Sequence, residues 1–399
     1  MAVVVQKYGG SSVADVERLG KVADKVVAAR SAGDDVVVVV SAMGKATDQL
    51  LALAKQIDET PPRRELDMLL TTGERVSMAL LSMAIQKRGV DAISFTGSQS
   101  GIITNDRHFD ARIIEVRPHR IEDELARSRV VIVAGYQGMS YRREITTLGR
   151  GGSDTTAIAL AAALGAARAE IYSDVDGVYT ADPRVVDSAR HIAELTYVQM
   201  QEMADVGAKV LNAQAVELAR KARIFIHARS TFEDSRESIV RDESLTQAVA
   251  VVGQKDVFRV HVADHGALHR ALAVCDEFAL PTRDVVASGN RAAFLLAASL
   301  APDWARARAR LEEEVPAIEL EKDLATASLI GAMDGKALMK AMSKLTRENV
   351  MTYGLNQTAT RISLLVHERD VDRTVRALHD EFVDVPSNMP NQAGFPDAR

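Results

Sequence analysis

The sequence predicts an α/β protein: an open, mostly parallel sheet with helices on both faces, followed by a smaller α+β region. From Met1 to about Phe232, short β-rich runs alternate with helical stretches, the order expected of parallel strands joined by helices. Residues 36–40 are five valines in a row, as in a strand buried on both faces. After Thr246 the pattern changes to strand, helix, strand, strand.

The elements of the first region follow from their apolar periods. The predicted strands are residues 3–6, 36–40, 92–95, 130–134, 170–173 and 224–227. The predicted helices are residues 13–33, 47–58, 66–87, 154–164 and 208–221. Ser12 is placed to cap the first of these helices, and Gly89 to end the third.

The second region divides into two similar halves, each resembling a βαββαβ unit of the ferredoxin-like type. The first half has strands 257–262, 284–287 and 292–297 and helix 267–278; the second has strands 328–330 and 360–366 and helices 335–348 and 370–382. Residues 233–246 are polar and charged without an apolar period, which predicts a linker. The expected domains are therefore 1–232 and 247–383. The tail 384–399, with three prolines, is expected to be disordered.

Composition excludes several classes of protein. The 399 residues carry a formal charge of -6, which gives no basic field for nucleic acid or for an anionic membrane. The single Cys275 excludes a disulfide framework within the chain. The apolar run at the start is broken by Lys7, and no later run approaches the ~18 apolar residues of a membrane span. We expect a soluble, cytoplasmic enzyme.

The first chemical motif, Lys7-Tyr8-Gly9-Gly10-Ser11-Ser12, follows a strand and opens a helix. The glycines let backbone N–H groups approach an anion, and Lys7 adds a full positive charge. The spacing of a P-loop is missing, so that class of phosphate site is excluded. The alternative interpretation is an ordinary turn with a solvated lysine.

The second motif is a Gly-rich turn, residues 147–157, that leads into an apolar helix. Two anion-binding turns in one domain suggest that two anionic ligands meet there, as a phosphoryl donor and a carboxylate acceptor would. Arg150 is suited to clamp a carboxylate with two parallel hydrogen bonds. Asp154 or Ser153 is alternatively a simple helix cap.

The third motif, residues 172–184, mixes acidic, aromatic and basic side chains after a strand. Such a loop can hold a purine, ribose hydroxyls and a metal-phosphate group. Its Asp176-Gly177 and Asp182-Pro183 pairs are also common turn sequences, so neither is informative alone.

The three motifs in this order resemble the aspartokinases of the amino-acid kinase superfamily, over about residues 1–232. Two shorter segments agree: Ser41-Ala42-Met43-Gly44 through Thr47-Asp48, and Thr72-Gly73-Glu74-Arg75 followed by Phe95-Thr96-Gly97. The resemblance implies an ATP-dependent aspartate kinase that uses Mg²⁺, at the start of the pathway to lysine, threonine and methionine. No metal ligands are assigned.

The resemblance also implies residue roles. Lys7, Arg150 and Asp154 would be catalytic. The residues that would bind aspartate are Ser41, Thr47, Glu74, Arg150, Gly152, Ser153 and Asp154. Those that would contact ATP are Lys7, Tyr8, Gly9, Gly10, Ser173, Asp174, Tyr179, Asp182, Arg184 and Lys209.

The reaction that the resemblance implies is in-line transfer from MgATP to a carboxylate oxygen. Because a carboxylate is already ionised near neutral pH, no general base is needed. Positioning and charge stabilisation by Lys7, backbone amides and Mg²⁺ would carry the rate.

The second region resembles the paired ACT domains with which aspartokinases sense lysine or threonine. It keeps the apolar pattern but diverges at the effector-type residues, for example at residues 263–268, 288–291 and 353–358. ACT units pair edge to edge, so a homodimer is implied; some members also make a separate small subunit. His261, His265 and His269 recur at four-residue spacing, but His261 lies in a predicted strand, so we interpret them as structural.

Two other functions remain open from the sequence. One is a kinase of the same fold that acts on another acid, such as glutamate or an aspartate analogue. The other is a nucleotide-binding regulatory subunit with weak catalysis, which the intact Lys7, Glu74, Arg150 and Asp174 argue against.

Overall fold

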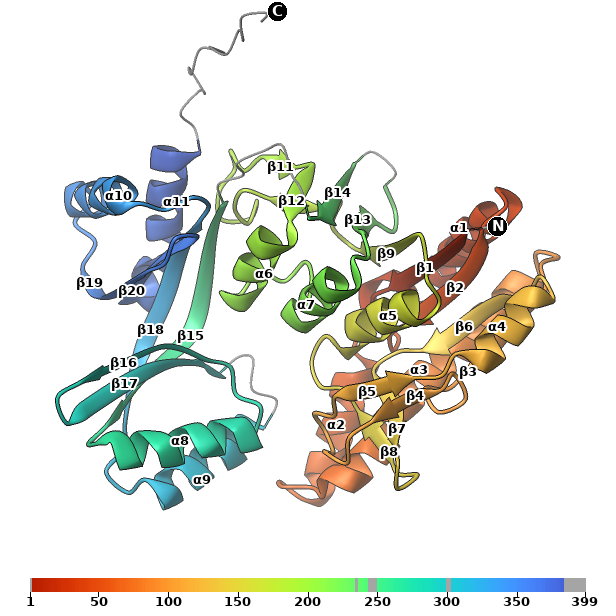
Figure 1. Ribbon diagram of the computed structural model, residues 1–399, viewed down its shortest axis with the longest axis horizontal. Coiled ribbons are helices and arrows are strands. Elements are labelled where there is room, and N and C mark those ends of the chain that lie inside the picture. Colours follow the sequence, from red (N-terminus) through yellow and green to blue (C-terminus); the bar gives the residue numbers. More distant parts are fainter. Residues whose placement is uncertain (1, 234–235, 243–249, 299–302, 384–399) are drawn as a thin grey trace, which may run out of the picture.

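The structure, a computed structural model, describes residues 2–233, 236–242, 250–298 and 303–383 (Figure 1). The expected disordered tail, 384–399, lies outside the described residues. The chain forms a larger N-terminal α/β part and a C-terminal part built on an antiparallel sheet.

The N-terminal part is organised around an eight-stranded sheet with the order β12-β14-β13-β9-β1-β2-β6-β3. Only the pairing of β13 with β14 is antiparallel, so the predicted mostly parallel sheet is confirmed. The strands are β1 (Val3–Tyr8), β2 (Asp35–Val40), β3 (Ala92–Phe95), β6 (Val130–Ala134), β9 (Arg168–Ser173), β12 (Glu194–Thr196), β13 (Ile226–Ser230) and β14 (Glu237–Arg241).

Helices cover both faces of this sheet (Figure 1). One face packs an apolar cluster against α1 (Val16–Ser31) and α3 (Arg63–Gln86). The other packs a cluster against α4 (His119–Ala126), α5 (Gly152–Ala163), α6 (Tyr197–Asp205) and α7 (Ala213–Ala222). Among the described helices only α3 has the length and mean hydropathy of a membrane span, and here it packs against α1, β2, β3 and β6.

Of two predicted helix boundaries, one differs in the structure and one is found there. The expected cap at Ser12 was wrong: Asp15 caps α1, and its side chain accepts a hydrogen bond from the Arg18 backbone N–H. Ser12 lies instead in the short 3-10 helix η1 (Gly10–Val13), with its Oγ 2.6 Å from Thr231 Oγ1. The stop at Gly89 is confirmed, because its φ of +82° is one that glycine adopts without strain just after α3.

A second, four-stranded sheet has the order β5-β4-β7-β8 and was not predicted. It consists of β4 (Ile102–Thr104), β5 (Ile113–Val116), β7 (Gln137–Ser140) and β8 (Ile145–Thr147). Strands of three or four residues are too short to show a period. The 105–112 loop joins β4 to β5, and the Gly-rich turn follows β8. This sheet therefore positions both segments near the carboxyl ends of the strands of the main sheet.

Strand β14 lies inside segment 233–246, which we expected to be a linker. Its five residues alternate between partly exposed and buried, and they pair with both β12 and β13. The polar composition of this segment gave no strand signal, although it contains a short strand, second from the edge of the sheet, in which the alternate residues Ser238 and Val240 are buried.

The C-terminal part is a six-stranded antiparallel sheet in the order β16-β17-β15-β18-β20-β19, with helices packed on it (Figure 1). Its strands are β15 (Ala250–Val262), β16 (Thr282–Ser288), β17 (Arg291–Ala297), β18 (Glu319–Ile330), β19 (Thr352–Gln357) and β20 (Arg361–His367). Its helices are α8 (His265–Glu277), α9 (Trp304–Glu314), α10 (Gly335–Arg347) and α11 (Val371–Phe382).

The two C-terminal units are nested, and not consecutive as the sequence suggested. Residues 250–254 at the start of β15 pair with 326–330 of β18, beside the strands and helices of the second unit. Residues 257–262 at the end of β15 pair with β17, in the first unit. The first unit is therefore inserted between the first strand and the remainder of the second, and both share two long strands.

The second unit also packs against the N-terminal part. Ala181 and Val186, from the third sequence motif, belong to the same apolar core as Val251 of β15 and Val375 and Leu378 of α11. The loop of that motif is thus attached to the C-terminal sheet.

Candidate active site

The first motif lies at the carboxyl end of β1, where parallel sheets bind ligands. Lys7 Nζ is 2.7 Å from Asp154 Oδ1, and both side chains are about nine-tenths buried. Position 10 has room only for glycine, because a Cβ there would lie 2.9 Å from the Ala42 carbonyl oxygen. The Gly44 N–H donates to the Gly10 carbonyl at 3.0 Å, so the loops after β1 and β2 hold each other.

The Tyr8 side chain, which the family resemblance placed at ATP, is buried. Its ring stacks on Tyr172 with the centroids 4.7 Å apart, and its exposed fraction is 0%. The side chain belongs to the core of the sheet, and the Tyr8 carbonyl accepts from the Ser41 N–H at 3.1 Å, so Tyr8 presents no exposed group to a ligand.

The Gly-rich turn sits between β8 and α5 and closes the same end of the sheet. Gly149 and Gly151 have φ of +71° and +76°, which other residues rarely adopt. Gly151 is the residue preceding α5, and no side chain caps this helix, so the capping interpretation of Ser153 and Asp154 was wrong. Asp154 instead pairs with Lys7.

Arg150 is exposed on this turn, and no side-chain partner for its guanidinium is found in the part of the chain that the structure describes. Its carbonyl accepts a hydrogen bond from Asn212 Nδ2 at 3.2 Å. Asn212 also caps α7 by accepting from the backbone N–H groups of Gln214 and Ala215. The turn is therefore anchored to α7 while the guanidinium stays available.

Glu74 approaches the site from α3. Its Oε1 accepts from the Ala42 N–H at 3.2 Å, and its buried Oε2 has no hydrogen-bond partner among the described residues. Burial raises the pKa of Glu74 to about 7, and the hydrogen bond from Ala42 opposes the rise. A ligand ammonium at Oε2 would supply the missing partner.

These residues surround one cavity of about 380 Å³. The cavity is lined by all seven residues assigned to aspartate and by two of those assigned to ATP. They are Ser41, Thr47, Glu74, Arg150, Gly152, Ser153 and Asp154, together with Lys7 and Gly10. Basic and acidic groups thus face a single space that matches a small amino acid carrying both charges.

The remaining residues assigned to ATP lie outside that cavity lining. Ser173 Oγ is 3.3 Å from the Val175 N–H, and Tyr179 donates its hydroxyl to Asp176 at 2.7 Å. Asp182 and Arg184 form an ion pair at 2.7 Å, and this pairing lowers the pKa of Asp182. Asp174 and Lys209 are exposed.

Sequence reasoning missed several residues at the cavity. Leu51, Leu70, Phe109 and Tyr136 supply its apolar wall. Asp67 lies just behind that wall and is fully buried. The sequence did contain a pattern that indicates Asp67. Asp67, Thr71 and Glu74 recur at helical spacing among the apolar residues of α3, so they lie on one buried side of the helix.

The three histidines that we interpreted as structural do not form a cluster. His261 lies in β15 with its Nε2 3.2 Å from Glu321, while His265 and His269 belong to α8. Within the described residues, no group of three His, Cys, Asp or Glu side chains is arranged to hold a metal ion.

Comparison with known proteins places this site in context. The sequence model of the amino acid kinase family matches residues 2–229. The chain is 43% identical to the aspartokinase of Mycolicibacterium smegmatis over 411 aligned residues, with 96% of each chain covered. It is 39% identical to aspartokinase 2 of Bacillus subtilis, covering 96% of this chain and 98% of the relative.

Solved structures agree in fold. Aspartokinase III of E. coli in complex with aspartate and ADP, in its R-state, superposes with a TM-score of 0.83 at 24% identity, covering 96% of this chain and all of that one. Aspartate kinase from Synechocystis is 35% identical with a TM-score of 0.56, covering 97% of this chain and 70% of that one.

Proposed function

The chain belongs to the amino acid kinase family and is an ATP-dependent aspartate kinase, and we propose that the cavity at the carboxyl ends of β1 and β2 holds its L-aspartate. The enzyme transfers the γ-phosphoryl group of ATP to the β-carboxylate and gives 4-phospho-L-aspartate and ADP. The observation that carries the proposed site is the unpartnered Glu74 Oε2 in the same cavity as Arg150 and Lys7.

Charge complementarity supports one orientation of the substrate. Glu74 Oε2 would accept from the α-ammonium, and the guanidinium of Arg150 would clamp the α-carboxylate. Ser41, Thr47 and Ser153 offer hydroxyls, and the turn at Gly152 offers backbone. The β-carboxylate then points toward Lys7.

In the transfer, a β-carboxylate oxygen forms a bond to the γ-phosphorus while the bond from that phosphorus to the bridging oxygen breaks. ADP leaves with the electron pair of the broken bond. The carboxylate is ionised at neutral pH, so no base has to remove a proton. Lys7 neutralises charge that spreads over the phosphoryl oxygens, and Asp154 fixes its Nζ, so that little reorganisation is needed.

We place ATP against the loop of residues 173–184, with Ser173, Asp174, Tyr179, Asp182 and Arg184 as contacts, and with Gly9, Gly10 and Lys209 near the phosphates. Mg²⁺ bound to ATP would neutralise phosphate charge. In the absence of a cluster of three ligand side chains among the described residues, its ligands would be mostly phosphate oxygens and water.

For the C-terminal units we propose ACT-like domains that pair two copies of the chain. The edge strands β16 and β19 leave Val285, Val286, Tyr353 and Leu355 between 38% and 59% exposed, which supports an edge that a second copy covers. Light scattering after size exclusion tests for the homodimer, and a short co-purifying chain would identify a separate regulatory subunit. We place the enzyme in the cytoplasm, at the start of lysine, threonine and methionine biosynthesis.

The test of this function is a coupled assay of ADP release with L-aspartate, L-glutamate and no acceptor, repeated with lysine, threonine and both. We expect release that depends on aspartate. Faster turnover of glutamate would instead support a same-fold kinase for another acid, and ADP release that no amino acid stimulates would support a regulatory subunit. Arg150→Ala should raise the KM for aspartate at least tenfold, since the bidentate carboxylate contact is lost.

A further inference from the structure

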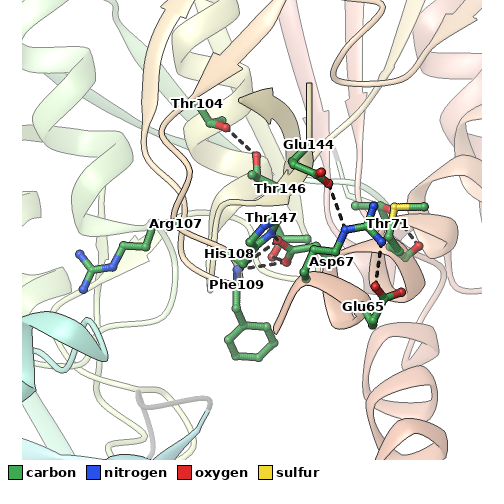
Figure 2. A network of polar contacts seen from close by, with 12 residues as sticks. Glu65, Asp67, Thr71, Thr104, Arg107, His108, Phe109, Glu144, Thr146 and Thr147 are labelled. Carbon is green, nitrogen blue, oxygen red and sulfur yellow. Dashed lines mark hydrogen bonds and ion pairs between the residues drawn. The ribbon is translucent and has the colours of Figure 1, made fainter. Parts of the chain in front are cut away.

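Asp67 is a fully buried acid that faces the wall of the cavity and not the cavity itself. Figure 2 shows three donors converging on its carboxylate from two other segments. His108 Nδ1 lies 2.6 Å from Oδ2, the Phe109 N–H donates at 3.1 Å to Oδ1, and the Thr147 hydroxyl donates at 2.6 Å to Oδ1. A buried carboxylate persists only with such compensation.

The first attached segment is the loop between β4 and β5. Phe109 has a φ of +72°, an uncommon conformation for a bulky residue, and its ring lines the cavity. Such a backbone is retained only where surrounding contacts hold it. The Phe109 N–H contributes to holding it, because it lies 3.1 and 3.2 Å from the two carboxylate oxygens of Asp67.

The second attached segment is the end of β8. Thr147 lies three residues before Arg150, and its carbonyl accepts from the Ala111 N–H at 2.7 Å. The two segments are also in close contact at Gly149 and Asp110. A Cβ added at Gly149 would lie only 2.6 Å from Asp110 Oδ1. One carboxylate therefore joins the aromatic wall of the cavity to the turn that carries Arg150.

We propose that Asp67 is a positioning residue for the substrate: it fixes Phe109 and the Arg150 turn in the geometry that binds the amino acid. This inference deepens the proposed function and rests on it. Asp67 is not among the residues that line the cavity, and it acts through Thr147 and Phe109. In the part of the chain that the structure describes, no hydrogen bond or ion pair joins loop 173–184 to this network, so we expect the effect to be confined to the acceptor amino acid.

The test is steady-state kinetics of the full chain with each substrate varied. Asp67→Asn keeps the size of the side chain but cannot accept from three donors together. We expect the KM for aspartate to rise about tenfold or more, because small displacements of a clamp cost large factors, while the KM for ATP stays within about twofold. Asp106→Asn is the matched control, on the same loop but exposed, and should change neither KM.

A second pair of variants keeps the inference testable if Asp67→Asn does not fold. Thr147→Val keeps the shape and loses the hydroxyl, whereas Thr147→Ser keeps the hydroxyl. We expect the valine variant to raise the KM for aspartate and the serine variant to restore it. In the double variant with Asp67→Asn, the effects should combine to less than their product, because both side chains belong to one hydrogen-bond network.

Two results would overturn the inference. One is a KM for aspartate within twofold of the parent in both Asp67→Asn and Thr147→Val. The other is a joint rise of both KM values, which indicates a general loss of structure. Arg150→Ala separates the two proposals. If this variant leaves the KM for aspartate unchanged, the proposed substrate site is wrong. If it raises that KM while the Asp67 and Thr147 variants do not, only the proposed role of Asp67 is wrong.

Discussion

Thr180 Oγ1 and His379 Nε2 lie 2.9 Å apart, and both side chains are buried. Thr180 belongs to the loop that we propose for ATP, and His379 to α11 of the second unit. The Thr180 hydroxyl also accepts from the Arg190 N–H at 2.9 Å, and its carbonyl accepts from the Val251 N–H at 2.7 Å. One threonine thus ties the loop to both the last helix and β15.

Thr180→Val tests this connection. The substitution keeps the shape but removes the hydroxyl that contacts the buried His379 Nε2, which should cost about 1–3 kcal/mol of unfolding free energy. We expect the KM for ATP to rise severalfold and the KM for aspartate to stay unchanged. Ser363→Ala, which removes a buried hydroxyl pair inside the second unit, is the control and should lower stability without changing either KM.

Lys7→Ala should lower kcat by about two to three orders of magnitude, the usual effect of removing one group that stabilises transition-state charge. The KM for aspartate should change far less, because Glu74 and Arg150 remain. Initial rates at saturating ATP measure both constants. Lys21→Ala, at an exposed ion pair on α1, is the control. Unaltered kinetics in the Lys7 variant would contradict the assignment.

The raised pKa of Glu74 predicts that kcat/KM for aspartate depends on pH. Its pKa of about 7 means that the carboxylate which binds the ammonium is mostly protonated at pH 6. The ratio kcat/KM for aspartate should therefore fall about tenfold between pH 8 and pH 6. Because the folded pKa is raised above the ordinary value of 4.5, the contribution of Glu74 to stability is present below about pH 4.5 and is lost as the pH rises through 7.

Glu74→Gln is the control for this dependence. It removes the titrating group, so the fall in kcat/KM between pH 8 and pH 6 should flatten, at a KM for aspartate that is high throughout. A profile that keeps the same midpoint in the glutamine variant would show that another group titrates.

Arg361 joins three parts of the chain. Its guanidinium lies 2.9 Å from Glu202 of α6 and 3.3 Å from Asp284 of β16, and Arg361 itself begins β20. Arg361→Met should lower the free energy of unfolding by about 3 kcal/mol, because two largely buried carboxylates lose their ion pairs with the guanidinium. Urea unfolding followed by the fluorescence of the single Trp304 measures the loss in the first unit. Arg369→Met, at an exposed ion pair, should change it little.

The sequence by itself determined the local elements of the sheet and the chemical motifs. Strands such as 36–40 and the helix after the Gly-rich turn were predicted correctly, because their apolar period and glycines are adjacent in the chain. The motif resemblance also identified the residues that the structure brings to one cavity, among them Glu74 and Arg150.

Tertiary structure decided what depends on residues far apart in sequence. The nesting of the C-terminal units follows from pairing residues 250–254 with 326–330, which no local pattern encodes. The burial of Tyr8 results from stacking on Tyr172. The carboxylate of Asp67 meets donors 41 and 80 positions away, and only the folded chain places them within hydrogen-bond distance.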